Sequence, residues 1–185
     1  MIEAELKARV KDRTALVELL DQWAVGRAEV YRDTYYDTAE RTLEARDAEL
    51  RVRTVESAYG AARTVRTYKS AAVDEESGSK PEHETAVADP EAVHAVVRGL
   101  GYEPVIAFTK HCTNYTVTVR GRQMLATVVQ VPEIDGVFVE VETMTGPEGL
   151  AGALADVRAF LPGLGIGEGD LTRELYTDAV RARRG

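Results

Sequence analysis

The sequence predicts an α+β fold in which antiparallel strands carry charged residues on one face and helices cover the other face. The first segment alternates apolar and charged residues, a pattern typical of a strand with one charged face. Three Glu-x-Glu pairs also stand in strand-like segments, and a helix-like segment follows each of them. The chain has 185 residues, enough for one hydrophobic core, so we expect a single domain over residues 1–185.

The predicted first strand has an apolar face and a charged face. Its apolar residues are Ile2, Ala4, Leu6, Ala8 and Val10, and its charged residues are Glu3, Glu5, Lys7, Arg9 and Lys11. A helix should follow, from a cap at Asp12 to Trp23, because apolar residues recur there at helical spacing. Further strands are predicted over Glu29–Asp37, Ala48–Val55 and Thr64–Ser70, with a hairpin turn at Gly60–Ala62 between the last two.

The middle of the chain repeats the strand-then-helix order. Residues Val73–Ser79 are polar and acidic without periodicity, which predicts a mobile loop. A strand over Lys80–Val87 follows. Asp89 and Pro90 then occupy the favoured cap and first-turn positions of a helix that ends at Gly99–Gly101.

The second half predicts four more strands and two helices. The strands, each rich in β-branched residues, are Val105–Lys110, Tyr115–Arg120, Leu125–Val131 and Val137–Met144. One helix should run from Gly146 to Leu161, and another from a cap at Asp170 towards Arg183. The glycine-rich segment Gly163–Gly169 follows a helix instead of a strand, so we interpret it as a flexible connection and not as a phosphate-binding loop.

Composition excludes several classes of partner. The net charge is −8 and aromatic residues make up 6% of the chain, which disfavours nucleic acid and anionic membranes as ligands of the outer surface. Met1–Glu5 lacks the basic and apolar regions of a signal peptide, and no apolar stretch is long enough to span a bilayer, so we expect a cytoplasmic protein. The single cysteine, Cys112, is interpreted as a small half-buried residue.

Charged residues of both signs share one register across the predicted strands. The Glu-x-Glu pairs are Glu3/Glu5, Glu82/Glu84 and Glu140/Glu142, and the basic residues are Lys7, Arg51, Arg53, Lys69, Lys80 and Lys110. For any one strand, this pattern is also typical of the solvated face of an open sheet. If about eight strands close into a barrel, however, the charges face inward and require mutual pairing, water or a charged ligand. Carboxylates suit Mg²⁺ or Mn²⁺, and lysine and arginine suit phosphate oxygens, which together indicate a metal-bridged polyphosphate site.

Six motifs in order resemble those of the CYTH superfamily, the triphosphate tunnel metalloenzymes. They are Glu3-Ala4-Glu5-Leu6-Lys7 (E-x-E-x-K), Asp33-Thr34-Tyr35-Tyr36-Asp37, Leu50-Arg51-Val52-Arg53, Thr67-Tyr68-Lys69, Lys80-Pro81-Glu82-His83-Glu84 and Phe138-Val139-Glu140-Val141-Glu142. Length and motif spacing resemble the class IV adenylyl cyclase branch. The resemblance implies an eight-stranded antiparallel β-barrel, the triphosphate tunnel, with helices packed on the outside. Tunnel proteins of this kind are often dimeric, so a homodimer is left open.

The resemblance also implies roles for individual residues. Phosphate oxygens would be bound by Lys7, Arg51, Arg53, Lys69, Lys80 and Lys110. Mg²⁺ or Mn²⁺ would be held by Glu3, Glu5, Glu140 and Glu142, with Glu82 and Glu84 as further ligands or as partners of the basic groups. The reaction implied first is cyclisation of ATP to cyclic AMP and pyrophosphate. The alternative is hydrolysis of thiamine triphosphate or inorganic tripolyphosphate.

Two positions depart from the family pattern. A basic cluster is replaced by Lys110-His111-Cys112, and an aspartate is replaced by Gln130. His111 is a candidate acid or base, although a lone histidine is more often a packed or solvated residue. The predicted catalytic group is therefore Glu3, Glu5, Lys7, Lys110 and His111. The two departures also leave open a non-catalytic nucleotide- or polyphosphate-binding module, or a divergent enzyme of a specialised pathway acting on a phosphorylated metabolite.

Overall fold

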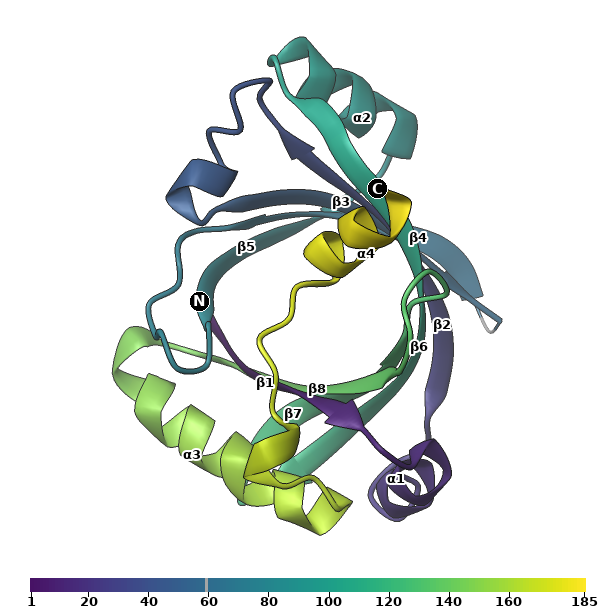
Figure 1. Cartoon of the computed structure of the whole chain (residues 1–185), viewed down its shortest axis with the longest axis vertical. Coiled ribbons are helices and arrows are strands. Elements are labelled where there is room, and N and C mark those ends of the chain that lie inside the picture. The colour runs from purple at the N-terminus through teal and green to yellow at the C-terminus, as the bar shows by residue number, and fades with distance from the viewer. Residues whose placement is uncertain (59) are drawn as a thin grey trace.

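The computed structural model describes residues 1–58 and 60–185, in which eight antiparallel strands close into a barrel (Figure 1). The strand order around the barrel is β1-β5-β4-β3-β2-β6-β7-β8. The strands are β1 (Ile2–Val10), β2 (Arg27–Asp37), β3 (Glu49–Ser57), β4 (Gly60–Lys69), β5 (Lys80–Val87), β6 (Glu103–Val119), β7 (Arg122–Gln130) and β8 (Val137–Thr145). The barrel confirms the predicted fold class and rejects the open-sheet alternative.

Four α-helices lie outside the barrel wall or across its end (Figure 1). They are α1 (Arg13–Leu20), α2 (Pro90–Gly99), α3 (Leu150–Phe160) and α4 (Tyr176–Arg184). Asp12 and Asp89 cap α1 and α2 by accepting from the backbone N–H groups three residues on, as the sequence predicts. In the part of the chain that the structure describes, no helix has the length and apolar character needed to cross a membrane.

The largest difference from the sequence prediction lies in β6. The two strands predicted at Val105–Lys110 and Tyr115–Arg120 are one continuous strand of 17 residues. Residues 103–114 pair with β2 on one side, and residues 111–119 pair with β7 on the other. The four intervening residues take part in both pairings, so their backbone stays extended although their side chains give a weak strand signal.

Three predicted boundaries are also wrong. Gly60–Ala62 belongs to β4 and is not a turn, because Gly60 already pairs with Ser57 of β3. The helix α1 ends at Leu20, three residues before Trp23. The last helix begins at Tyr176 instead of after Asp170, because residues 171–175 run along β1, where Leu171 bridges to Ala8 and Thr172 donates to the Lys7 carbonyl.

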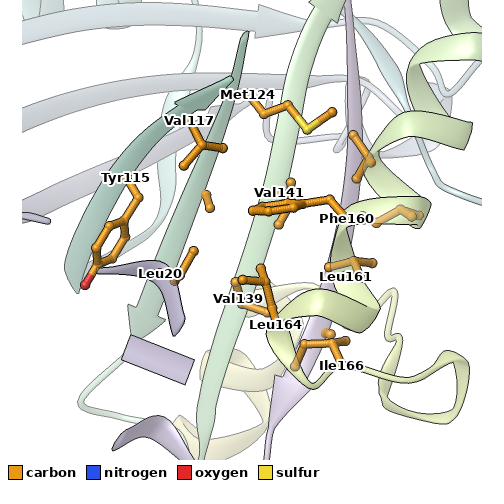
Figure 2. Packing of buried hydrophobic residues seen from close by; sticks show 14 of the residues in the cluster. Leu20, Tyr115, Val117, Met124, Val139, Val141, Phe160, Leu161, Leu164 and Ile166 are labelled. Carbon is orange, nitrogen blue, oxygen red and sulfur yellow. The ribbon is translucent and has the colours of Figure 1, made fainter. Parts of the chain in front are cut away.

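The main hydrophobic core lies between the outside of the barrel and the helices α1 and α3 (Figure 2). Val139 and Val141 of β8 are fully buried there, together with Leu20 of α1 and Val157 of α3. A smaller cluster under α2 contains Val52 and Val97. Because side chains alternate across a strand, an apolar outer face places the intervening charged residues inside the barrel.

Candidate metal and phosphate site in the tunnel

The barrel encloses a cavity of about 310 Å³ whose walls are strongly charged but electrically balanced. Among the described residues, seven acidic and seven basic side chains line it. The acidic residues are Glu3, Glu5, Glu49, Glu82, Glu84, Glu140 and Glu142, and the basic residues are Lys7, Arg51, Arg53, Arg63, Lys69, Lys80 and Lys110. Every glutamate, lysine and arginine that the sequence predicts for the site therefore reaches the same cavity.

Three glutamates form a compact carboxylate cluster on neighbouring strands. Glu3 and Glu5 come from β1, and Glu142 of β8 stands directly opposite Glu5 in the strand pairing. One oxygen from each carboxylate lies within 4.8 Å of the other two, the separation expected of ligands that share one cation. The closed barrel holds these oxygens together because β1 and β8 pair over nine residues.

The electrostatics of this carboxylate cluster fit a bound divalent cation. Burial, together with the charges of Glu140 and Glu3, raises the pKa of Glu5 to about 7. The pKa of Glu142 lies well above its ordinary value, first because of burial and then because of Glu3 and Glu5. Lys69, which pairs with Glu3, offsets part of the repulsion among the three carboxylates, and a divalent cation would offset the rest. Oxygen ligands suit Mg²⁺ or Mn²⁺.

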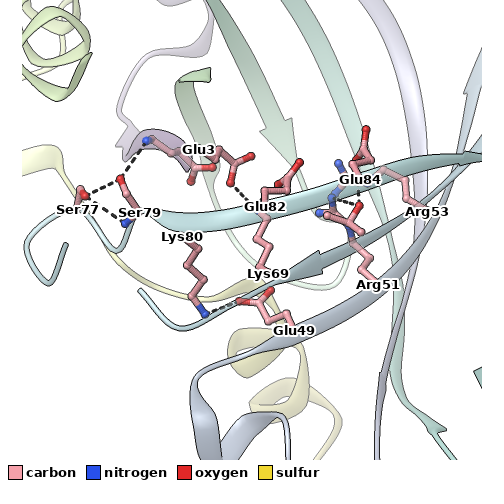
Figure 3. Close-up of polar contacts among 12 residues, drawn as sticks. Glu3, Glu49, Arg51, Arg53, Lys69, Ser77, Ser79, Lys80, Glu82 and Glu84 are labelled. Atoms are coloured by element: carbon pink, nitrogen blue, oxygen red, sulfur yellow. Dashed lines mark hydrogen bonds and ion pairs between the residues drawn. The ribbon is translucent and has the colours of Figure 1, made fainter. Parts of the chain in front are cut away.

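The other three predicted metal ligands lie beside hydroxyl or basic groups instead. Glu82 pairs with Lys69 at 3.2 Å, and Glu84 accepts from the Thr67 hydroxyl at 2.9 Å (Figure 3). Burial would raise the pKa of Glu140, but Lys110 and Lys7 lower it below its usual value. Within residues 1–58 and 60–185, only Glu3, Glu5 and Glu142 form a group with ligand spacing.

Three of the predicted phosphate-binding residues are held by acidic groups of the chain itself. Arg53 donates twice to Asp33, at 2.6 and 2.7 Å. Lys69 pairs with Glu3 and Glu82. Lys80 Nζ donates to the Asp47 carbonyl and to the carboxylates of Asp47 and Glu49 at 2.8–2.9 Å, as Figure 3 shows for Glu49. These contacts already use most of the hydrogen-bonding capacity of the three cations.

The remaining predicted phosphate-binding residues, Lys7, Arg51 and Lys110, are weakly neutralised in the sense that no described carboxylate lies within hydrogen-bonding distance of them, although the charge of Glu140 acts on both lysines. In the described part of the chain Lys7 and Arg51 form no ion pair, and Lys110 Nζ is 3.9 Å from Asp33. The Arg51 Nε atom is buried without a hydrogen-bond partner, while its Nη2 atom donates to Thr67 at 3.3 Å. These three cations are the groups best placed to bind an anion in the tunnel.

The structure places His111 outside the tunnel. Because Lys110 points inward, the alternation of β6 turns His111 outward, where it is exposed and stands opposite Gln130 of β7. Both residues line a separate outer pocket with Arg13. This placement does not support the predicted catalytic role of His111. Cys112 is fully buried instead of half-buried, and burial raises its pKa to about 12, so it is not a reactive thiol.

Several residues that line the cavity or hold its cations were not predicted from the sequence. Asp33 and Glu49 hold Arg53 and Lys80, and both could have been found from the register of their strands. Asp33 belongs to one of the six motifs that resemble the CYTH pattern, but the resemblance implies no role for it. No sequence pattern predicts Tyr176 as a cavity residue, because it enters the cavity from the start of α4 and not from a barrel strand.

The fold and the cavity define a closed β-barrel protein with a charged internal tunnel. Residues 1–176 match the family model of the CYTH domain, and the chain belongs to this family. CYTH proteins are metal-dependent, bind triphosphates, and include enzymes of the adenylyl cyclase and triphosphatase classes.

Individual relatives cover almost the whole chain at low identity. A protein of Methanocaldococcus jannaschii assigned by name as an adenylate cyclase is 23% identical over 96% of this chain and 98% of its own. The solved structure of the PH1819 protein of Pyrococcus horikoshii covers 99% of both chains at 23% identity, with a TM-score of 0.82. A Hippeastrum protein, HpAC1, covers 98% of this chain and 96% of its own at 18% identity, with a TM-score of 0.66, and is described as having a dominant triphosphatase activity. These two structures share the fold.

Proposed function

We propose that this protein is a metal-dependent enzyme that acts on an organic triphosphate, with cyclisation of ATP to cyclic AMP and pyrophosphate as its first candidate reaction. The observation that carries the proposal is the pairing, in one cavity, of a carboxylate cluster with three weakly neutralised cations. The carboxylates suit a hard divalent cation, and the cations suit the phosphate oxygens bridged to it. The adenylate cyclase name of the M. jannaschii relative favours this reaction.

Glu3, Glu5 and Glu142 would hold the Mg²⁺ or Mn²⁺ ion, because their oxygens have the required spacing. When bound, the ion would polarise the phosphate and lower the pKa of the attacking hydroxyl. Lys7, Arg51 and Lys110 would bind the phosphate chain and stabilise the negative charge that develops on it. In cyclisation, the ribose 3′-oxygen bonds to the α-phosphorus, the bond from that phosphorus to the bridging oxygen breaks, and pyrophosphate leaves; the hydroxyl proton passes to solvent.

The cavity also offers uncharged surface for the organic part of a substrate. Tyr35, Val65 and Leu125 line the tunnel between the charged residues. An inorganic tripolyphosphate would leave such surface unused, whereas a sugar or a base would cover it. This lining favours an organic triphosphate.

Hydrolysis is the second candidate, and the triphosphatase activity described for HpAC1 favours it. The same residues would bind the phosphate chain, but water would attack a terminal phosphorus. The bond from that phosphorus to the bridging oxygen would break, the diphosphate part of the substrate would leave, and the attacked phosphorus would become orthophosphate. Both reactions require the carboxylate cluster and the three cations, so the products distinguish them.

The test is to incubate the protein with ATP, thiamine triphosphate or tripolyphosphate, each with Mg²⁺ or Mn²⁺, and to separate the products by chromatography. Cyclic AMP with pyrophosphate supports cyclisation, and orthophosphate supports hydrolysis. Tight binding without any product would overturn both and favour a binding module. Chelation with EDTA should abolish turnover, and turnover that persists in EDTA would contradict the metal requirement.

A further inference from the structure

Tyr176 enters the tunnel from the C-terminal segment. Residues 171–175 run beside β1, held by the Leu171–Ala8 bridge and the Thr172–Lys7 backbone hydrogen bond, and α4 begins where this segment reaches the barrel end (Figure 1). The Tyr176 ring packs edge-on against Phe138 with a centroid distance of 5.2 Å. These contacts fix the ring against the interior of the barrel, where only 5% of the residue is exposed.

The ring contacts both lysines that remain weakly neutralised. Lys7 Nζ lies 4.5 Å and Lys110 Nζ 4.3 Å from the centroid of the Tyr176 ring. Such cation–π contacts hold an ammonium group in place without consuming its hydrogen bonds. The ring therefore orients two cations while leaving their N–H groups available to a ligand.

The Tyr176 hydroxyl is a buried group without a hydrogen-bond partner in the described part of the chain. Burial raises the pKa of this hydroxyl most, and the nearby Glu140 carboxylate raises it further through its charge and a weak hydrogen-bonding contact, although the two groups form no hydrogen bond of normal distance and angle. The hydroxyl therefore keeps its proton and remains a donor. A buried donor beside two cations lacks an acceptor, and a ligand oxygen would supply one.

We infer that Tyr176 is a substrate-binding residue whose hydroxyl donates a hydrogen bond to a phosphate oxygen held between Lys7 and Lys110. This inference rests on the proposed function, because it requires a polyphosphate in the tunnel. It assigns the C-terminal segment a direct part in the site: the barrel strands supply the charges, and the segment supplies a neutral donor. Phosphate oxygens accept readily from hydroxyl groups, so the three groups together complete one anion-binding position.

The decisive variant is Tyr176→Phe, which removes the hydroxyl and retains the ring over both lysines. Tyr36→Phe is the matched control, because Tyr36 is similarly buried but its hydroxyl shares a hydrogen bond with His94 on the outside of the barrel. Calorimetry with Mg²⁺ and tripolyphosphate should show about tenfold weaker binding for Tyr176→Phe, the effect of one hydrogen bond to a charged group. Tyr36→Phe should bind like the wild type.

The outcomes separate this inference from the proposed function. Wild-type protein that binds neither tripolyphosphate nor ATP in the presence of Mg²⁺ overturns both. Wild-type binding that is unchanged in Tyr176→Phe overturns the role of the hydroxyl and leaves the proposed function standing. A second measurement places 3-fluorotyrosine at residue 176: its fluorine resonance should shift when Mg²⁺ and tripolyphosphate are added, and a resonance that stays fixed at saturation would contradict the contact.

Discussion

The Asp33–Arg53 pair shows how the barrel tolerates charge in its interior. Asp33 has no exposed side-chain surface, and Arg53 contacts it through two hydrogen bonds while lying 4.4 Å from the centroid of the Tyr31 ring. Burial alone would raise the pKa of Asp33, but the Arg53 charge and its hydrogen bonds lower the pKa below the usual 3.8. The paired geometry therefore offsets the cost of removing both groups from water.

Replacing Asp33 with Asn should lower the free energy of unfolding at pH 7 by about 3–5 kcal/mol, because Arg53 would be left buried without its counter-charge. Since the folded-state pKa is lowered, the stabilisation is complete above the ordinary aspartate pKa and is lost as the pH falls through the folded value. Urea unfolding should therefore show a smaller difference from wild type at pH 3 than at pH 7.

A matched control for this variant is Glu56→Gln, which breaks the exposed Arg32–Glu56 pair between the same two strands. Exposed ion pairs contribute little to stability, so this variant should unfold almost like the wild type. Equal stability of the wild type and Asp33→Asn would contradict the importance assigned to the buried pair.

Lys7 is the single cation whose loss should most directly weaken phosphate binding. Its ammonium group lies over the Tyr176 ring and forms no ion pair in the described residues, so its charge is available to a ligand. Lys7→Gln should weaken binding of tripolyphosphate in the presence of Mg²⁺ by roughly 10- to 100-fold in calorimetry. Lys11→Gln, on the exposed end of the same segment, should have little effect. Similar binding by both variants would rule out Lys7 as a phosphate ligand.

The sequence predicts the residues of the cavity better than their roles. Strand alternation is enough to place Lys7, Arg53 and Lys80 on the charged face of their respective strands, and in the structure all three line the cavity. Alternation does not identify which acid faces which base, because partners such as Asp33 and Asp47 come from other strands and loops. For His111, alternation gives the better prediction. Its place next to Lys110 suggests a catalytic role, but adjacent residues of β6 face opposite sides, so His111 lies outside the barrel.

At the scale of elements, α1 and α3 determine which side of the sheet is buried. Leu20 at the end of α1 has no exposed surface, and it belongs to the same cluster as Val139, Val141 and Phe160. The edge-on contact of Trp23 with Phe160, 5.2 Å between centroids, links the end of α1 to α3. Loss of this packing would expose the apolar outer face and remove the reason for the charged residues to face inward.

Leu20→Ala should therefore lower the free energy of unfolding by about 2–5 kcal/mol, because it removes a fully buried side chain and leaves a cavity. Val96→Ala is a suitable comparison, since Val96 lies on α2 with 54% of its surface exposed and should change stability much less. Urea denaturation of both variants measures the difference. Comparable losses for the two variants would show that the α1 contact is not a main source of stability.

The helices and short strands were easier to predict than the connections between them. Asp12 and Asp89 signal helix starts through local capping chemistry, which a sequence contains. The continuity of β6 depends on pairing with β2 and β7 at the same time, and the extended course of residues 171–175 depends on β1. Such non-local pairing leaves no local pattern, so the sequence predicts a start for the final helix that precedes the observed one at Tyr176.

For the whole molecule, the charge of −8 lies outside the tunnel lining. Seven acids and seven bases balance one another in the cavity, so the acidic excess belongs to the other residues. Net charge is consequently a poor indicator of what the tunnel binds. The local distribution is more informative: carboxylates gather at Glu3, Glu5 and Glu142, whereas Lys7, Arg51 and Lys110 remain largely unpaired. A divalent cation at the carboxylate cluster would make the cavity positive enough for a polyphosphate.

Glu142 is expected to lower the stability of the metal-free protein and to increase its affinity for a metal ion, and a single variant can test both effects. Burial and the charges of Glu3 and Glu5 raise the pKa of Glu142 well above its usual value, so its ionised form is unfavourable in the metal-free protein. Glu142→Gln should therefore raise the melting temperature measured in EDTA at neutral pH, because on folding Glu142 must either take up a proton or ionise beside two carboxylates, and glutamine avoids both costs. The same variant should lose most of the rise that Mg²⁺ with tripolyphosphate gives the wild type, since ligand-dependent stabilisation follows affinity.

Glu148→Gln provides the control, because Glu148 is an exposed residue outside the cavity and should leave both melting temperatures near those of the wild type. Scanning calorimetry of the three proteins, with EDTA and then with Mg²⁺ and tripolyphosphate, separates the two effects. A Glu142→Gln protein that is less stable than wild type in EDTA would show that the carboxylates do not repel one another as the geometry indicates. A rise in melting temperature with Mg²⁺ and tripolyphosphate as large as that of the wild type would instead show that Glu142 is not a metal ligand.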